Sequence, residues 1–471
     1  ESRKESRSAS RFTGRRVHFI GIGGCGMSGL ARMLIDAGAI VTGSEPKPNP
    51  QTFELTARGA KISRDQLGEL LSAQTDLVVR TAAVPDGNIE FRAALKYGTP
   101  TMKYAELLGE VMAERFGVAV AGTHGKSTTT AMIAFALVEC GADPSFVVGG
   151  TVPQLDGAGS RSGASDLFIA EACEYDRSFH ALRPKVALIT NIEEDHLDCY
   201  SGIEEINQSF NVFAKLVPSD GNEKSAGRII ANGRDANVVK ALAGVKASVE
   251  TVSLDPGTTW STFPGPIVGG CQTGAVCRDG KPVATLKLSI PGMHNLFNAT
   301  MALAACVACG VEPQKAADAI GRFAGVDRRM TVMGRLNGAT IIDDYGHHPT
   351  EIRATLSALR ERYDPKRLIC VFQPHQHSRT RFLLDDFATS FAAADETIVP
   401  DIYFVRDSES ERQSVSSDDL VLRINGNGQT ALHIAEFAGI VEHLRATVRA
   451  GDLVVTMGAG NVWEIGRDLL S

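Results

Sequence analysis

The sequence predicts an α/β protein of three domains whose sheets are mainly parallel. Its length of 471 residues fits about three domains, since ~150 residues per domain is usual. Short apolar runs alternate with amphipathic helical patterns from end to end, which is typical of βαβ units. Three glycine-rich turns, at residues 21–26, 122–125 and 458–461, each follow an apolar run and precede a helical pattern. We therefore expect three compact α/β domains along the chain.

Composition excludes several classes of protein. The formal net charge is −7, and the first 16 positions hold six basic residues against two acids, so the rest of the chain is more acidic still. This balance argues against a nucleic-acid or membrane partner. No apolar run reaches the ~18–20 residues that span a bilayer, which rules out a transmembrane protein. The nine cysteines are an odd number and most lie among apolar or small residues, so we expect reduced thiols in a cytoplasmic protein.

The first block follows a Ser/Arg-rich stretch, residues 1–15, which lacks the apolar core of a secretory signal and is expected to be a disordered tail. Its expected elements are strands at 17–22, 39–43 and 76–80, a helix ending near 37 and a helix at 104–115. Gly21-Ile-Gly-Gly-Cys-Gly26 fits G-x-G-x-x-G between strand and helix, where a helix N-terminus can hold a diphosphate. Glu45 stands about where a ribose-binding acid would lie. The plainer alternative is a tight turn without a ligand.

The second block contains a phosphate-binding loop of a shortened type. Its expected elements are strands at 118–121, 166–172, 185–191 and 228–232, short strands and loops over 254–290, and helices ending near 140 and at 294–309 and 313–323. The turn from Gly122 to Thr128 ends in Gly-Lys-Ser, although Val120 stands where the usual first glycine would be. Its backbone amides should hold a β-phosphate, Lys126 should reach the β- and γ-oxygens, and the Ser127 hydroxyl should bind Mg²⁺.

Acids and a histidine follow the next two strands of this block. Glu171 ends the strand at 166–172, where a carboxylate beside a phosphate loop is placed to hold Mg²⁺. Glu193, Glu194, Asp195, His196 and Asp198 follow the strand at 185–191. As a cluster they predict a second cation site with His196 as its ligand, because a second metal reduces the repulsion between an acceptor carboxylate and a γ-phosphate. For any single acid, a solvated turn is the plainer explanation.

The third block begins near residue 326. Its expected strands are at 340–345, 367–372, 396–400 and 453–457, with helices between them. Asp344 ends the first of these strands, and His347 and His348 precede Pro349 at a helix start, so that one of the two histidines could simply cap the helix. Arg379 stands at the next helix start, where its guanidinium could bind a phosphate or a carboxylate. The plainer alternative is an exposed surface arginine. The third glycine turn is explained equally well by tight packing and by a ligand.

Several segments resemble the Mur ligase family, the ATP-dependent amide-bond enzymes of peptidoglycan precursor synthesis. The segments are Gly-Thr-His-Gly-Lys-Ser-Thr-Thr from residue 122, Glu-Ala-Cys-Glu-Tyr-Asp from 171, Thr-Asn-Ile-Glu-Glu-Asp-His-Leu-Asp from 190, and parts of 21–28, 291–299, 343–351 and 372–380. The resemblance covers about residues 15–471. It implies a Rossmann-like UDP-binding domain at 16–108, a central P-loop ATPase-like domain at 109–325, and a Rossmann-like C-terminal domain at 326–471 that binds the amino acid and closes over ATP.

The resemblance also implies the site residues, with ATP and two Mg²⁺ ions as cofactors. The catalytic residues are Lys126, Glu171 and His196, and the metal ligands are Ser127, Glu171 and His196. The ATP-binding residues are Gly122, Thr123, His124, Gly125, Lys126, Ser127, Thr128, Asn295, Arg329 and Asp344. The substrate-binding residues are Gly23, Gly24, Gly26, Met27, Ser28, Glu45, Tyr345, His347, His375 and Arg379. Glu45 stands where many relatives have aspartate, and Lys215 does not match the carbamylated lysine of other branches.

The sequence most closely resembles the branch of the family that catalyses the first ligation step. That branch joins L-alanine to the carboxylate of UDP-N-acetylmuramate through an acyl phosphate. It implies small-molecule partners and a monomer or weak homodimer. The alternative within the family is a recycling ligase that adds a whole tripeptide to the same sugar. Outside the family, a dinucleotide-dependent oxidoreductase would explain only the first glycine turn, and a non-catalytic nucleotide-binding regulator would leave Lys126, Glu171 and His196 without a role.

Overall fold

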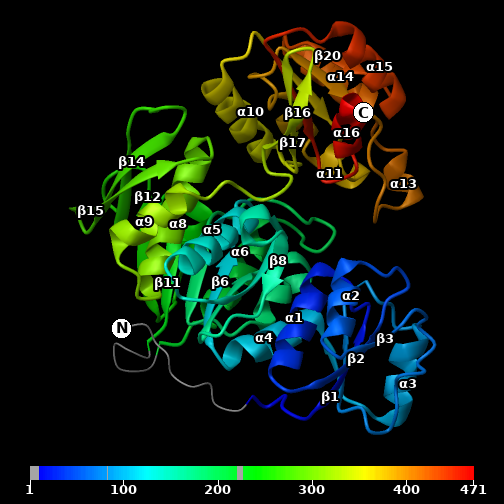
Figure 1. The fold of residues 1–471 in the computed structure, drawn as a ribbon. Coiled ribbons are helices and arrows are strands. Elements are labelled where there is room, and N and C mark those ends of the chain that lie inside the picture. Colours follow the sequence, from blue (N-terminus) through cyan, green and yellow to red (C-terminus); the bar gives the residue numbers. More distant parts are fainter. Residues whose placement is uncertain (1–9, 82, 220–225) are drawn as a thin grey trace.

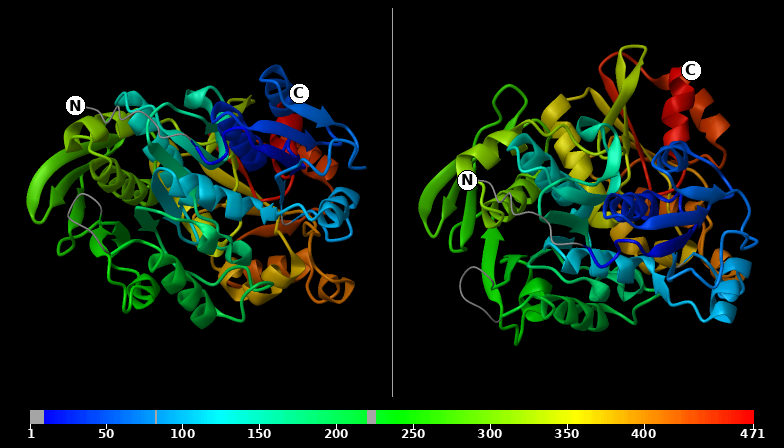
Figure 2. Two further views of the ribbon diagram at one scale, coloured as in Figure 1. Left: turned by 90° about the horizontal axis from the view of Figure 1, so that it is seen from below. Right: turned by 60° about the horizontal axis from the view of Figure 1, so that its bottom comes forward.

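The computed structural model describes residues 10–81, 83–219 and 226–471 and contains three sheets, each flanked by helices. The sheets follow one another along the chain, so each defines one unit: N-terminal, central or C-terminal. In Figure 1 the central unit (cyan to green) lies beside the N-terminal unit (blue) and below the C-terminal unit (yellow to red). The two turned views of Figure 2 show the same units from further sides. The predicted three-part α/β fold is confirmed.

The N-terminal unit is a five-stranded parallel sheet with the strand order β3-β2-β1-β4-β5. The glycine-rich turn joins the central strand β1 to α1, as expected for a nucleotide-binding crossover. The elements are β1 Arg16–Ile20, α1 Cys25–Asp36, β2 Ile40–Ser44, α2 Pro50–Ala57, β3 Lys61–Ser63, β4 Leu77–Arg80, α3 Ile89–Tyr97, β5 Thr101–Lys103 and α4 Tyr104–Ala113.

The central unit is a ten-stranded sheet with the order β15-β14-β13-β12-β11-β10-β6-β9-β7-β8. Its middle strands are parallel, whereas β8, β14 and β15 run antiparallel to their neighbours. The elements are β6 Phe116–Ala121, α5 Lys126–Glu139, β7 Ser145–Val152, η1 Pro153–Leu155, β8 Ala158–Arg161, β9 Leu167–Glu171, η2 Tyr175–Ala181, β10 Val186–Ile189, α6 Ile203–Ala214, β11 Arg228–Asn232, α7 Ala236–Ala241, β12 Ser248–Ser253, β13 Trp260–Pro264, β14 Gln272–Arg278, β15 Lys281–Leu288, α8 Met293–Ala308 and α9 Pro313–Gly321.

The C-terminal unit is a six-stranded sheet with the order β16-β17-β21-β18-β19-β20, in which only the β16–β17 pair is antiparallel among the described strands. The elements are β16 Thr331–Leu336, β17 Ala339–Asp344, α10 Pro349–Tyr363, β18 Arg367–Phe372, α11 His377–Phe382, α12 Leu384–Ala388, β19 Glu396–Val399, α13 Glu409–Arg412, α14 Ser417–Gly426, β20 Ala431–His433, α15 Phe437–Thr447, β21 Asp452–Met457 and α16 Trp463–Leu470.

The apolar cores show which units are tied together. Alternate residues of β6 point to opposite faces of the central sheet, as in any strand. Ala119 and Ala121 share one buried cluster with residues of the N-terminal unit, joined through α4, while Val118 and Val120 belong to a second cluster with α5 and α8. The C-terminal unit has two clusters of its own, one on each face of its sheet. The N-terminal and central units therefore share a core, and the C-terminal unit meets them through other contacts.

Two expectations need correction. Residues 10–15, placed in a disordered tail, pack against α4: Phe12 is 2% exposed, and Arg11 forms ion pairs with Glu110 and Glu114. The rest of that tail, residues 1–9, lies outside the described residues. All nine cysteines are free, as expected, but Cys25 and Cys173 are exposed and do not serve as small core residues. In the described part of the chain, no helix has the length and apolar character needed to cross a membrane.

Candidate active site

The loop between β6 and α5 has the geometry of a phosphate cradle. Gly125 is in the left-handed region at φ +80° directly before the first turn of α5, where free N–H groups and the helix dipole favour an anion. Gly122 has φ +141°, and a Cβ there would lie 1.9 Å from the Thr190 hydroxyl oxygen. Only glycine fits between this loop and the end of β10. The strand-turn-helix predicted from the Gly-Lys-Ser ending is therefore present.

Lys126 is held by three acceptors. Its Nζ donates to the carbonyl oxygens of Gly122 at 2.6 Å and Thr123 at 3.0 Å, and to Oε1 of Glu174 at 2.9 Å. The lysine side chain is 13% exposed and that of Glu174 is 4% exposed. Burial alone would lower the pKa of Lys126, but the Glu174 carboxylate raises it, so the ammonium stays charged. Glu174 is a site residue that the sequence analysis quoted in a motif without giving it a role.

The predicted metal ligands lie in one cavity. Ser127 Oγ donates to Glu171 Oε1 at 3.0 Å, and the backbone N–H of Gly149 donates to the other carboxylate oxygen at 2.7 Å. His196, at φ +54°, has its Nε2 at 3.4 Å from Glu174 Oε1. The structure thus brings Ser127 into contact with Glu171 and places His196 beside the partner of Lys126. One hydroxyl, one carboxylate and one imidazole suit a divalent cation.

Two neighbouring cavities meet at the phosphate loop. The first, about 490 Å³, lies over α8 and α10 and is lined by the predicted ATP residues His124, Gly125, Thr128, Asn295, Arg329 and Asp344. The second, about 530 Å³, is lined by Thr123, Lys126, Ser127, Glu171 and His196 of the central unit and by Tyr345, His347, His375 and Arg379 of the C-terminal unit. Gly125, Arg329 and Glu351 line both. The residues predicted to bind the nucleotide and those predicted to bind the substrate therefore line one continuous region.

The first cavity suits a nucleoside. Asp344 is buried at the end of β17 and accepts backbone N–H groups from Gly346 at 2.7 Å and Met330 at 2.9 Å. Burial raises the pKa of Asp344 to about 6, although Arg329 counteracts this. Asn295 at the start of α8 donates to the carbonyl of Pro291 at 2.7 Å. An apolar slot with a few fixed polar groups is the usual form of a small-molecule pocket.

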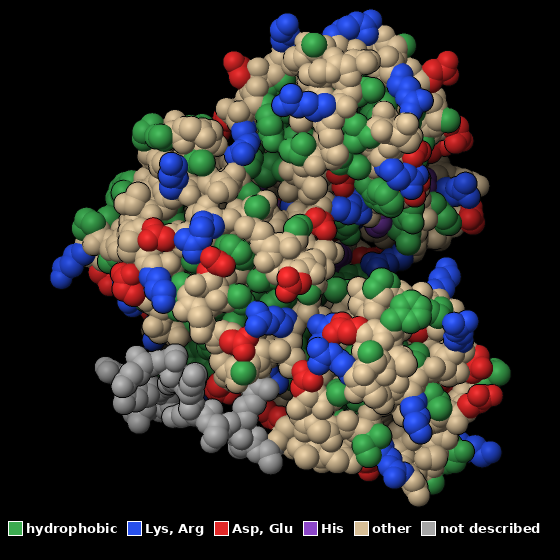
Figure 3. Space-filling model, viewed as in Figure 1, with side chains coloured by type: hydrophobic (Ala, Val, Ile, Leu, Met, Phe, Trp, Pro, Cys, Tyr) green, Lys and Arg blue, Asp and Glu red, His purple; other side chains and the backbone are tan. Residues whose placement is uncertain are grey.

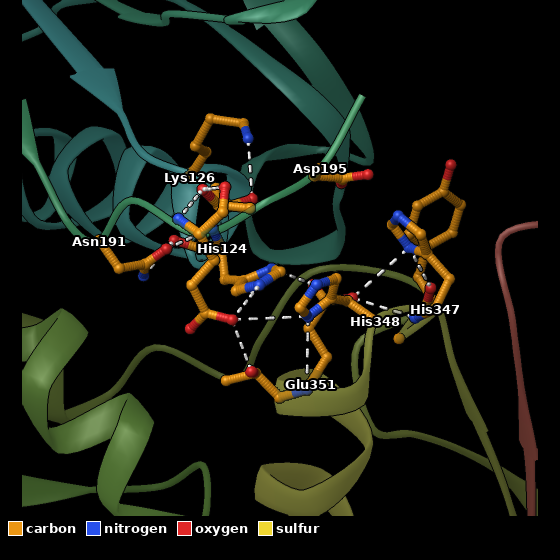
Figure 4. Close-up of polar contacts among 12 residues, drawn as sticks. His124, Lys126, Asn191, Asp195, His347, His348 and Glu351 are labelled. Atoms are coloured by element: carbon orange, nitrogen blue, oxygen red, sulfur yellow. Dashed lines mark hydrogen bonds and ion pairs between the residues drawn. The ribbon is translucent and has the colours of Figure 1, made fainter. Parts of the chain in front are cut away.

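Polar contacts close the central unit against the C-terminal unit. Arg379 donates twice to Asp195 Oδ1, at 2.8 and 3.1 Å, and both side chains are largely buried. The Arg379 guanidinium holds the pKa of Asp195 far below its usual range against the opposing effect of burial. His124 Nδ1 lies 3.5 Å from Glu351 Oε1, and Figure 4 shows these side chains meeting between the phosphate loop and α10. Figure 3 shows basic, acidic and histidine side chains around the hollow beside the C-terminal unit.

The two adjacent histidines have different positions. His348 is the N-cap of α10, where its Nδ1 accepts the N–H of Thr350 at 3.4 Å. His347 instead lines the second cavity, and burial lowers its pKa to about 3. Burial, reinforced by Arg379, likewise lowers the pKa of His375 to about 4. The helix cap left open by the sequence is thus His348, and both cavity histidines are neutral near pH 7.

The N-terminal turn differs in part from the expectation. Met27 and Ser28 are buried, with Ser28 Oγ donating to the carbonyl of Cys25 at 3.1 Å, so neither side chain faces a ligand. Both side chains lie on the inner face of α1, and the selection of these two residues as substrate-binding stays a prediction. Glu45 Oε2 accepts the N–H of Gly23 at 3.1 Å, which places the acid at the turn. Gly24 is exposed, and a Cβ on Gly26 would lie 2.6 Å from the Tyr104 hydroxyl oxygen.

The third glycine turn packs tightly and also borders the site. A Cβ on Gly460 would lie 2.5 Å from the Gln373 side-chain oxygen, and a Cβ on Gly458 would lie 2.8 Å from the Gln373 backbone oxygen. Ala459 between them lines the second cavity. Glu351, which contacts Arg329, His124 and His347, is the other residue whose place only the structure shows.

This fold and site define a three-domain α/β protein with a phosphate-binding type of loop that faces its C-terminal unit. Three family models match the chain in order: "Mur ligase family, catalytic domain" at residues 16–116, "Mur ligase middle domain" at 120–306 and "Mur ligase, glutamate ligase domain" at 328–460. The chain belongs to the Mur ligase family.

The similarity to known proteins extends over nearly the whole chain. The UDP-N-acetylmuramate–L-alanine ligase of Caldanaerobacter subterraneus is 44% identical over 97% of both chains, and that of Agathobacter rectalis is 41% identical over 96% of this chain and 97% of the relative. Among solved structures, the UDP-N-acetylmuramate–alanine ligase of Thermotoga maritima has a TM-score of 0.76 at 24% identity, covering 97% of this chain and 98% of that one. A murein peptide ligase of Psychrobacter arcticus has a TM-score of 0.67 at 28% identity, with the same coverage.

Proposed function

We propose that this protein catalyses the ATP-dependent ligation of L-alanine to the carboxylate of UDP-N-acetylmuramate, a step of peptidoglycan precursor synthesis. One observation carries the proposal: Lys126 and the predicted metal ligands share a cavity with His347, His375 and Arg379 of the other unit. A phosphoryl donor and an amine acceptor can therefore meet in one enclosed space. The full-length relatives at 37–44% identity bear the name of this reaction.

Positively charged groups of both units face the site of phosphoryl transfer. The main obstacle is repulsion between the sugar's carboxylate and the nucleotide phosphates, so fixed positive groups must face the transferred phosphoryl group. Lys126 and the N-terminus of α5 supply that charge from the central unit, and Arg379 supplies it from the C-terminal unit. The carboxylate attacks the γ-phosphoryl group to give an acyl phosphate and ADP, and the amine of L-alanine then displaces phosphate. The departing phosphate can take the proton that the amine loses, while His347 and His375, neutral near pH 7, line this space.

We assign Mg²⁺ to Ser127, Glu171 and His196. The donor set fits the ion, because a hydroxyl and a carboxylate oxygen lie 3.0 Å apart at the mouth of the phosphate loop. When bound, the ion neutralises phosphate charge, and a second ion would be held on the His196 side of the cavity. The residues themselves orient the nucleotide.

Three narrower proposals accompany this function. The domain boundaries are those expected at residues 108–109 and 325–326, between the sheets of the three units. The protein acts as a monomer or weak homodimer, because each chain carries all the residues of the site. The reaction takes place in the cytoplasm, where ATP and nucleotide sugars are at hand and the nine free thiols remain reduced.

The test is phosphate release with UDP-N-acetylmuramate and a panel of acceptors: L-alanine, glycine, L-serine and the L-Ala-γ-D-Glu-diaminopimelate tripeptide. We expect L-alanine to give the highest kcat/KM and release to require both the sugar and ATP. Faster turnover with the tripeptide would overturn the assignment in favour of a recycling ligase. Release with no dependence on the sugar would overturn ligation itself.

A further inference from the structure

Three side chains from two units face one another beside the phosphate loop, apart from the proposed Mg²⁺ ligands. They are His124 of the loop, Glu193 of the segment after β10 and His348 at the start of α10. Glu193 Oε2 lies 3.6 Å from His124 Nε2 and 3.6 Å from His348 Nδ1. The two imidazole rings have centroids 4.5 Å apart, and Figure 4 shows them side by side. We call this set the His-Glu-His cluster.

The spacing of the cluster suits one metal ion. All three potential ligand atoms lie within 4.8 Å of one another. Two ligands at the usual ~2.0–2.2 Å from a tetrahedral Zn²⁺ are about 3.3–3.5 Å apart, so the 3.6 Å separations need little adjustment. His124 Nε2 is buried and has no hydrogen-bond partner among the described residues. A buried nitrogen of this kind, aimed into the cluster, needs an acceptor or a metal.

Each histidine is also oriented from behind. His124 Nδ1 lies 3.5 Å from Glu351 Oε1, and His348 Nε2 lies 3.3 Å from the backbone oxygen of Glu194. The carboxylate behind His124 and the carbonyl behind His348 orient the two rings, which is the usual support of a metal-bound histidine. Metal binding would displace a proton from His124 and replace the 3.4 Å contact between His348 Nδ1 and the Thr350 N–H. Thr350 donates its hydroxyl to Glu193 Oε2 at 2.6 Å, a contact that a ligating carboxylate can keep.

The ligand atoms of the His-Glu-His cluster favour a different ion from the Mg²⁺ proposed for the reaction. Two imidazoles and one carboxylate favour Zn²⁺ and similar transition metals, whereas Mg²⁺ prefers oxygen ligands. We propose that His124, Glu193 and His348 form a binding site for a divalent transition metal of the Zn²⁺ type. The ion ties the central unit to the C-terminal unit, because His124 and Glu193 belong to one and His348 to the other.

The experiment uses the full chain and Co²⁺, whose visible absorption reports tetrahedral nitrogen and oxygen ligands. Excess Mg²⁺ is present throughout to occupy sites made of oxygen ligands. In His348→Asn, asparagine keeps the helix cap while removing the imidazole. In Glu193→Gln, an oxygen remains to accept the Thr350 hydroxyl. His433→Asn is the matched control, because His433 lies between Asp401 and Asp418 in β20, the edge strand of the C-terminal sheet.

We expect a tetrahedral Co²⁺ spectrum in the wild type that one equivalent of Zn²⁺ abolishes. The affinity should fall at least about tenfold in His348→Asn and Glu193→Gln and stay unchanged in His433→Asn. Circular dichroism confirms that each variant is folded. No tetrahedral spectrum in the wild type, or an unchanged affinity in both cluster variants, would overturn the proposal. Because binding is read without turnover, the result does not depend on the proposed ligase reaction.

Discussion

Replacing Lys126 by methionine separates its catalytic role from its structural one. Methionine keeps most of the aliphatic stem of the lysine but loses the ammonium, which donates to Gly122, Thr123 and Glu174 at 2.6, 3.0 and 2.9 Å. A preorganised charge lost from the phosphoryl-transfer site costs on the order of 10²–10³ in kcat. The change also leaves the Glu174 carboxylate, which is 4% exposed, without its positively charged partner. Breaking a buried ion pair on one side costs about 3–5 kcal/mol of stability.

The double variant Lys126→Met/Glu174→Gln distinguishes the two effects. Glutamine removes the stranded charge, so urea unfolding should show much of the lost stability restored, whereas phosphate release should stay low. Glu174→Gln alone is the control for the second change. Phosphate release by folded Lys126→Met within about tenfold of the wild type would refute the catalytic role. Recovery of activity in the double variant would show that the loss had been structural.

Three further outcomes test the site. In protein kept free of metal with a chelator, the two carboxylate neighbours of His124 raise its pKa from 6.5 to about 9 against the effect of burial. Its stabilisation, on the order of 3 kcal/mol, is therefore complete below pH 6.5 and is lost as the pH rises through 9. Urea midpoints from pH 6 to 10 should fall in the wild type and less steeply in His124→Gln; parallel curves would contradict this. Arg379→Gln removes the ion pair to Asp195, and small-angle scattering should then show a larger radius of gyration; an unchanged profile would mean that other contacts hold the units closed. Gly26→Ala places a methyl group 2.6 Å from the Tyr104 hydroxyl oxygen. This change should raise KM for the UDP-sugar more than KM for ATP. Equal effects on both KM values would argue against binding of the sugar nucleotide at this turn.

The parallel parts of the fold could be predicted because their signals are local. An apolar run, a glycine turn and an amphipathic helix occur together at β1, β6 and β21, and strand ends such as those of β11 and β18 agree with the expectation. The strand β15 was expected only as part of a region of short strands and loops. Its exposed and buried residues alternate from Ala284 to Leu288, yet Gly and Pro on either side hide this period-2 pattern.

The candidate site could be predicted where it follows contiguous motifs, and only there. Lys126, Ser127 and Glu171 were found because each lies at a strand end or helix start, where the chain direction fixes its place. The pair of Asp195 and Arg379 spans 184 residues and joins two units, so no local pattern reveals it. For Met27 and Ser28 the motif gives the position along α1, but it does not show that both side chains lie on the buried face of the helix.

The separate core of the C-terminal unit explains why its contacts with the central unit are polar. Apolar burial between them would fix one arrangement, whereas ion pairs can be exchanged for ligand charges at little net cost. Asp195 and Arg379 illustrate this, because they pair at 2.8 Å across the two units and both line the second cavity. A nucleotide phosphate entering between the cavities can take the guanidinium from the carboxylate. We therefore expect the substrates to replace paired charges of this kind when they bind.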